Sequence, residues 1–245
     1  MNPLENILAS PQAVELLLKK LHRQGQLAPL IREVHTDQLI RAQARQAGLE
    51  VTAQELQRAA DSFRRRHGLH TAADTQMWLD KRNLSVDEFE AGLEQDLLAS
   101  KVREHVTADA LERHWQMNQT GYERLRLALA TVDREDLARE VATQVRDEGR
   151  ELLDILREHG VALHRSERFR KDLGSPLANA AASAKVGQLV GPVISGGAIT
   201  LAVIEERRPA ELDQSTRQQI QDELFEAWLA ERLEHPVTLG AEHAC

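Results

Sequence analysis

The chain has 245 residues, of which 42% are hydrophobic and 29% are charged, and its formal net charge is -8 at pH 7. This length allows one or two globular domains that each bury a core. The negative net charge gives no sign of the broad basic face that nucleic acid or anionic lipid would need, so neither is expected as a partner. The single cysteine, Cys245, excludes an internal disulfide.

The N-terminal region contains a short apolar run at Val14 and Leu16–Leu18, which Glu15 interrupts. A secretory signal needs a longer apolar stretch behind a basic region, and a membrane span needs about 20 apolar residues. We therefore expect no membrane insertion and a cytoplasmic location.

The first half of the chain has the spacing of amphipathic helices, and helix-capping residues punctuate it. Thr52 with Glu55 and Ser85 with Glu88 fit capping boxes, and Thr71, Thr107 and Asp133 are further N-cap candidates. Apolar periodicity predicts helices over residues 11–24, 28–47, 53–67, 72–82, 86–105 and 108–118. Residues 1–121 are therefore predicted to form an all-helical module.

The second half alternates strand and helix signals. Leu125, Leu127 and Leu129 alternate with polar or small residues, which favours a strand over 122–132. The remaining pattern predicts helices at 133–148, 150–159 and 175–185 and strands at 161–169, 187–195 and 196–206. The order β, α, α, β, α, β, β indicates a small sheet with helices packed on it, so the fold class is α+β. A last helix is predicted over 213–234.

The run "KVGQLVGPVIS", followed by a Gly-Gly turn into the closing strand "AITLAVIEE", looks like a parvulin domain. This is the fold of PpiC-type peptidyl-prolyl cis-trans isomerases. The resemblance implies a parvulin-like mixed αβ domain over 122–208 and a C-terminal helix at 209–234. Pro236 and Gly240 break any further helix, so 235–245 is predicted to be a disordered tail.

The helical motifs "VTAQELQRAAD", "TQMWLDKRNLSVDEFE", "LLASKV" and "ELFEAWLAERL" resemble a bacterial, largely cyanobacterial group. In that group a SurA-like helical module precedes a parvulin domain, and the last helix packs back onto the module. The resemblance covers residues 35–234. It implies association with peptide export or maturation systems, and hence an export or maturation complex as a partner.

The parvulin resemblance also implies a proline pocket with one histidine on the first strand and another on the last. Residues 122–132 contain no histidine, and Thr200 stands where the second histidine would be. Thr200 is therefore the candidate catalytic residue; its alternative role is simply a β-branched strand residue. The candidate substrate-binding residues are Phe169, His164, Leu127, Leu129 and Ala202. Phe169 is equally interpretable as a core side chain, and His164 as a surface histidine.

No metal or cofactor is expected. The barrier to X-Pro isomerisation, about 18 to 20 kcal/mol, comes from lost amide resonance, so catalysis requires neither. His67 and His70 form a close pair, but no acidic residue accompanies them at metal-binding spacing.

Three functional hypotheses follow. The first is a foldase or chaperone that binds a proline-containing or unfolded client, such as a secreted or modified peptide precursor, with weak or no isomerase turnover. The second is an active prolyl isomerase with a histidine-poor site. The third is an architectural protein that bridges members of a complex.

Overall fold

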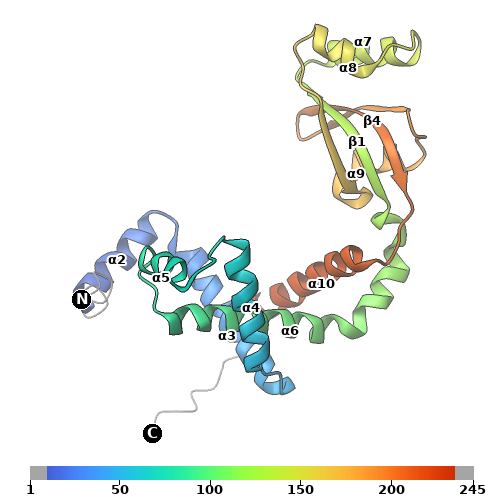
Figure 1. The fold of residues 1–245 in the computed structure, drawn as a ribbon. Coiled ribbons are helices and arrows are strands. Elements are labelled where there is room, and N and C mark those ends of the chain that lie inside the picture. Colours follow the sequence, from blue (N-terminus) through green and yellow to red (C-terminus); the bar gives the residue numbers. More distant parts are fainter. Residues whose placement is uncertain (1–9, 235–245) are drawn as a thin grey trace. The chain divides into compact units, whose positions relative to one another are not determined.

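The computed structural model describes residues 10–234, so the predicted tail and Cys245 lie outside the described part. The chain divides into two compact units. Unit 1 comprises residues 1–110 with 221–245, and unit 2 comprises 111–220. Helices together with one four-stranded antiparallel sheet make this an α+β protein, as predicted (Figure 1).

Within its described residues, unit 1 contains helices joined by loops and no strand. The predicted capping box of Thr52 and Glu55 is present, and Thr71 forms another one with Asp74. The described helices of this unit are α2 (Pro11–Arg23), α3 (Leu27–Ala47), α4 (Ala53–Arg66), α5 (Ala72–Asp80), most of α6 (Val86–Asn118) and the larger part of α10 (Gln214–Glu234).

The prediction of two helices at 86–105 and 108–118 was wrong, because α6 is continuous through both. Thr107 does not cap a new helix: it is buried, and its hydroxyl donates a hydrogen bond of 2.7 Å to the carbonyl of Arg103. A threonine whose hydroxyl bonds to the carbonyl four residues earlier is compatible with a helix interior. The sequence cannot distinguish this role from a cap.

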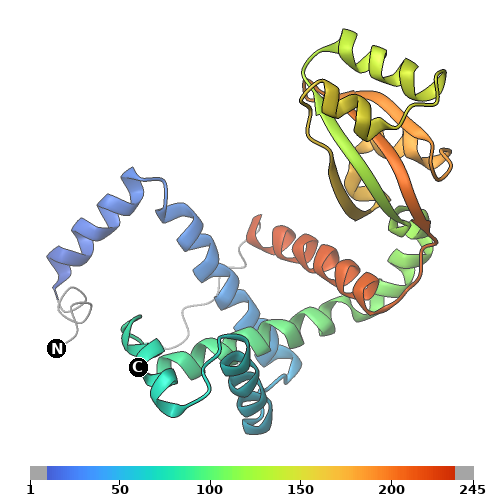
Figure 2. The same cartoon turned by 45° about the horizontal axis from the view of Figure 1, so that its top comes forward.

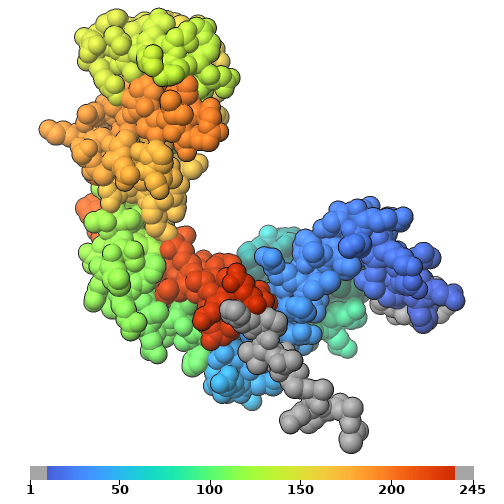
Figure 3. All heavy atoms as spheres, turned by 180° about the vertical axis from the view of Figure 1, so that it is seen from behind, coloured from blue at the N-terminus to red at the C-terminus, as the bar shows by residue number. Residues whose placement is uncertain are grey.

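The core of unit 1 joins helices that are far apart in the sequence. Side chains from α3, α6 and α10 form one buried cluster, which contains Ile40, Ala44, Val102, Phe225 and Leu229. An ion pair of 2.8 Å between Arg103 and Asp222 also joins α6 to α10. The predicted return of the C-terminal helix onto the helical module is thus confirmed, and Figure 3 shows α10 in red against α3 in blue.

Glu55 joins the start of α4 to α6. Its carboxylate accepts hydrogen bonds from Lys101 Nζ at 2.9 Å and from the backbone and hydroxyl of Thr52 at 2.8 Å. These donors stabilise the charged form, led by Lys101, and lower the pKa of Glu55 from 4.5 to about 2.

Glu55 should therefore make the stability of the protein depend on pH in the acidic range. A carboxylate whose pKa is lowered by folding stabilises the protein above pH 4.5, and this contribution is lost as the pH falls from 4.5 towards 2. We expect Glu55→Gln to lower the melting temperature at neutral pH, with the gap to wild type closing between pH 5 and pH 2. Glu50→Gln is the control, since the Glu50 side chain has no hydrogen bond or ion pair within residues 10–234. A gap that does not change with pH would contradict this assignment.

Unit 2 contains the sheet, with strand order β2-β1-β4-β3. The predicted succession of strands and helices is confirmed. The elements are η1 (Gln119–Tyr122), β1 (Arg124–Val132), α7 (Glu135–Arg146), α8 (Leu152–Glu158), β2 (His164–Phe169), η2 (Arg170–Leu173), α9 (Ser175–Ala182), β3 (Leu189–Ser195) and β4 (Ala198–Arg208). Asp133 was wrongly predicted as an N-cap: Arg134 occupies that position in α7, without a side-chain capping bond.

The two faces of the sheet bury different helices. One face packs on α7 and α8 through a cluster that includes Val132 and Leu201 from the two central strands. The other face packs on α9 through a cluster that includes Leu127, Ala202 and Ile204. Figure 2 shows the central pair, β1 and β4, lying side by side through the middle of this unit.

Gly191 lets the edge strand β3 bend next to β4. The pairing of β3 with β4 shifts between Val190 and Val193, and Gly191 has a φ of +104°. A Cβ added at Gly191 would lie 2.5 Å from the backbone oxygen of Thr200. Only glycine combines this φ with such a close backbone approach.

Replacing Gly191 tests this constraint. Gly191→Ala should lower the free energy of unfolding by about 3 kcal/mol or more, because a positive φ and a backbone clash act together. Gly187→Ala is the matched control, since Gly187 also has a positive φ of 81° but no atom within 4 Å of an added Cβ. Its cost should be only about 1 kcal/mol. Equal losses in urea unfolding would show that the Thr200 backbone does not restrict position 191.

Candidate functional site

The face of the sheet that carries α9 is only partly covered, and its uncovered part is the candidate site. Residues directly opposite each other in antiparallel strands point to the same face. By this register Thr131, Thr200 and Val193 form one row across β1, β4 and β3. Leu129 and His164 belong to the next row, with Ala202 and Val190. We call Leu129, Thr131, His164, Val193 and Thr200 the open face.

Five of the six predicted site residues share this side of the sheet. Leu127 pairs with Ile204, and Leu129 pairs with both Ala202 and His164. Leu127 and Ala202 are fully buried, whereas Leu129 and Thr200 are partly exposed and His164 is exposed. Of these five, only Leu129, Thr200 and His164 are thus accessible to a ligand. Leu127 and Ala202 belong to the buried cluster on the same face.

Phe169 lies apart from the open face. It pairs with Arg124, whose side chain belongs to the opposite side of the sheet. Its ring contacts Tyr122 edge-on at 5.6 Å between centroids, and the Arg124 guanidinium lies 5.3 Å from the ring. Phe169 also lines a separate pocket of about 470 Å³ with charged neighbours such as Glu167 and Asp172. It does not form the floor of a pocket at Thr200.

Sequence reasoning missed two residues of the open face, Thr131 and Val193. Thr131 lies directly opposite Thr200, and Val193 lies on its other side. The period of alternation along the first strand places Thr131 on the side of Leu127 and Leu129, so this signal was present. Val193 could not be placed, because the bulge at Gly191 changes the alternation along β3.

Arg207 fixes α9 over the covered part of the face. Its Nη2 donates to the carbonyls of Ala181 at 2.5 Å and Ala184 at 2.8 Å, at the end of α9. Its Nη1 donates to Glu123 at 2.7 Å. A cation at a helix C-terminus satisfies carbonyls that have no partner within the helix and complements the helix dipole. Arg207 therefore helps to determine where the open face begins.

Arg207→Met should detach this end of α9. Losing charge-assisted bonds to buried carbonyls is expected to cost about 2 to 3 kcal/mol of stability and to speed amide exchange in α9. Arg208→Met is the control, because Arg208 is exposed and, among residues 10–234, forms ion pairs only with Glu167 and Glu206. Its cost should stay below about 1 kcal/mol. Similar exchange rates in the two variants would argue against this role.

The chemistry of the open face is apolar contact combined with hydroxyl hydrogen bonding. Leu129 and Val193 offer an apolar surface to a proline ring or another apolar side chain. Thr131 and Thr200 each carry a hydroxyl that donates or accepts hydrogen bonds. Neither β1 nor β4 contains a histidine, and His164 on β2 is the one titratable side chain of the open face.

Residues 10–234 contain no group of three or more His, Cys, Asp or Glu side chains placed to hold a metal ion. Within the same range, no helix is both long enough and apolar enough to cross a bilayer.

Comparison with known families decides the identity of unit 2. Residues 106–215 match the model of the PPIC-type PPIASE domain. The chain contains a parvulin-type peptidyl-prolyl isomerase domain. The matched residues, 106–215, nearly coincide with unit 2, which comprises residues 111–220. The open face therefore lies on the sheet of the parvulin domain, as the sequence resemblance implied.

Solved structures that are similar over most of the chain have low sequence identity. A peptidylprolyl isomerase (PrsA) from Bacillus anthracis is 15% identical, with 83% of this chain and 91% of that chain covered and a TM-score of 0.45. PrsA from Bacillus cereus is 15% identical, with 89% and 81% covered and a TM-score of 0.43. A chain from a study of two SurA-like chaperones, PEB4 and Cj1289, of Campylobacter jejuni is 14% identical, with 86% and 82% covered and a TM-score of 0.29. A search of proteins with curated functions finds no match.

Proposed function

We propose that this protein is a foldase or chaperone of the parvulin type that binds a proline-containing or unfolded client and has weak or no isomerase turnover. The observation that carries the proposal is the composition of the open face. It combines apolar Leu129 and Val193 with two threonines, on a parvulin sheet whose β1 and β4 lack histidine.

Binding and catalysis make different demands on this face. Rate acceleration requires groups that stabilise the twisted amide more than the planar amide. Client binding requires only apolar surface and hydrogen-bonding groups that a peptide can reach. The open face meets the second requirement through Leu129, Val193 and the threonines, whereas the histidines associated with the first are missing from β1 and β4.

Unit 1 supports client binding through a second, independent surface. Six large apolar side chains of α2 and α3 are exposed, namely Leu16, Leu17, Leu18, Leu30, Ile31 and Val34. A groove of about 300 Å³ between these helices is lined almost entirely by apolar residues. Exposed apolar surface of this kind is typical of interaction sites.

A finer version of the proposal concerns the client and its location. We propose a secreted or modified peptide precursor as the client, an export or maturation complex as the setting, and the cytoplasm as the compartment. The support is the sequence resemblance of the helical motifs. Fractionation of cells and capture of precursor peptides by the purified protein would test these points.

An active isomerase with a histidine-poor site is the second candidate. It is favoured by the direct opposition of Thr131 and Thr200 on the open face, with His164 one row away. Two hydroxyls and an imidazole on one face are groups that can hydrogen-bond to a rotating amide.

Exchange NMR on short X-Pro peptides separates the two candidates. We expect the wild type to broaden the peptide resonances by binding and to leave the cis/trans exchange rate at its uncatalysed value. Val193→Gln should weaken binding by about threefold to tenfold, because apolar contact is lost. Ile194→Gln is the matched control: Ile194 is exposed, pairs with Ile199 and faces the opposite side of the sheet.

Two results would change the conclusion. Faster exchange in the wild type that Thr200→Ala abolishes would establish the isomerase instead of the non-catalytic foldase. Neither binding nor faster exchange, with longer unfolded clients included, would sink both candidates and leave an architectural role.

A further inference from the structure

Unit 1 contains a second groove, between the end of α3 and the first half of α6. Its volume is about 480 Å³, within the range of sites that bind small ligands or short peptide segments. It is lined by Arg41, Ala44, Arg45, Leu49, Glu50, Val51, Ala91, Glu94, Gln95 and Leu98. The function proposed above uses none of these residues.

The apolar floor of this groove is continuous with the buried core of unit 1. Leu49 and Leu98 are partly buried and pack against the cluster of Ile40, Val102 and Phe225. Helix α3 ends at Ala47 with Gly48 as its C-cap, and the backbone N–H of Leu49 donates to the carbonyl of Ala44 at 2.9 Å. This turn holds Leu49 beside Leu98.

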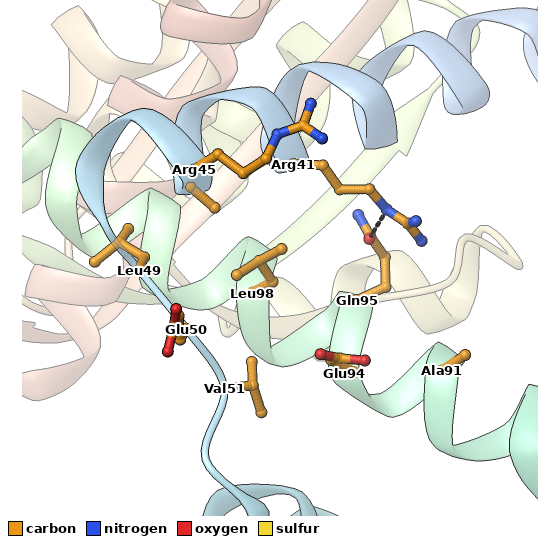
Figure 4. A pocket seen from close by; sticks show the side chains of 10 residues that line it. Arg41, Arg45, Leu49, Glu50, Val51, Ala91, Glu94, Gln95 and Leu98 are labelled. Carbon is orange, nitrogen blue, oxygen red and sulfur yellow. Dashed lines mark hydrogen bonds between the residues drawn. The ribbon is translucent and has the colours of Figure 1, made fainter. Parts of the chain in front are cut away.

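Opposite charges line the two walls. Figure 4 shows Arg41 and Arg45 on the α3 side and Glu50 and Glu94 on the other side, with Leu49 and Leu98 between them. Arg41 and Arg45 are four residues apart, so they share one face of α3. All four charged side chains are exposed.

Most of this charge is available to a ligand. Arg41 donates its Nε to Gln95 at 2.8 Å, which leaves its terminal amino groups for a further acceptor. Within residues 10–234, the side chains of Arg45, Glu50 and Glu94 have neither a hydrogen bond nor an ion pair. Two cations and two anions thus face an apolar strip without neutralising each other.

We propose that this groove binds a polypeptide segment in which an acidic, an apolar and a basic side chain follow one another. The acidic side chain pairs with Arg41 and Arg45, the apolar one covers Leu49 and Leu98, and the basic one pairs with Glu50 and Glu94. The inference deepens the client-binding function, on which it rests, by naming the chemistry of the client. A purely acidic or purely basic segment meets repulsion at one wall, so the groove selects mixed charge.

Fluorescence anisotropy with three labelled eight-residue peptides tests the proposal on the full chain. Their central sequences are Glu-Leu-Leu-Lys, Glu-Leu-Leu-Glu and Lys-Leu-Leu-Lys. The wild type should bind the mixed peptide most tightly, and added salt should reduce the difference. Arg45→Glu should shift the preference to the basic peptide, and Glu94→Arg should shift it to the acidic peptide. Each variant should lose about fivefold in affinity for the mixed peptide, as expected for exposed ion pairs turned repulsive.

Two exposed residues outside the groove provide matched controls. Arg32→Glu makes the same charge change on α3 as Arg45→Glu. Glu104→Arg makes the same charge change on α6 as Glu94→Arg. Both should keep the wild-type preference. A shift shared by Arg32→Glu and Arg45→Glu would reveal a net-charge effect and overturn the proposal, as would equal wild-type affinity for all three peptides. Unchanged melting temperatures would exclude misfolding as the cause.

Val193→Gln on the parvulin domain separates this proposal from the one on which it rests. Binding that depends on Val193 but not on Arg45 would leave the client-binding function standing and overturn the groove. A charge switch in Arg45→Glu that is insensitive to Val193→Gln would support the groove and count against the open face. No binding of any peptide would refute both.

Discussion

The pairing of β1 with β4 determines the chemistry of unit 2, because it decides which side chains share a face of the sheet. These two central strands align Leu129 with Ala202 and Thr131 with Thr200. A shift of one residue would move Thr200 to the side of α7 and α8 and bring Leu201 to the other side. The buried clusters on both faces oppose such a shift, since each contains side chains from both strands. The open face therefore follows from the packing of the whole domain.

Different residues of the parvulin domain maintain its scaffold and form its open face. Gly191 at the bulge and Arg207 at the end of α9 maintain the bend of β3 and the position of the helix. Neither residue needs to contact a client. The open face carries Leu129, Val193 and the threonines. Shape and apolar contact are sufficient for binding, because binding does not require groups that stabilise a twisted amide.

The two units offer different surfaces for one kind of ligand. The open face has hydroxyls and apolar side chains, the α2–α3 groove is almost purely apolar, and the groove of Arg45 and Glu94 is apolar between opposite charges. Each surface alone supports only modest affinity, since exposed ion pairs and small apolar contacts contribute about 1 kcal/mol each. Under the proposed function, weak contacts at several places would hold an unfolded chain without trapping it.

The sequence by itself determined the helices, the order of strands, the parvulin resemblance and the absence of histidine from the first and last strands. These features depend on local periodicity, capping residues such as Thr52 and Glu55, and residue identity. It could not show that α6 continues through Thr107, because a capping threonine and one bonded within a helix look alike in sequence. Tertiary structure alone decided that Phe169 lies away from Thr200 while Val193 lies beside it. Both placements depend on register between distant strands and on the bulge at Gly191, and neither is encoded in the spacing of neighbouring residues.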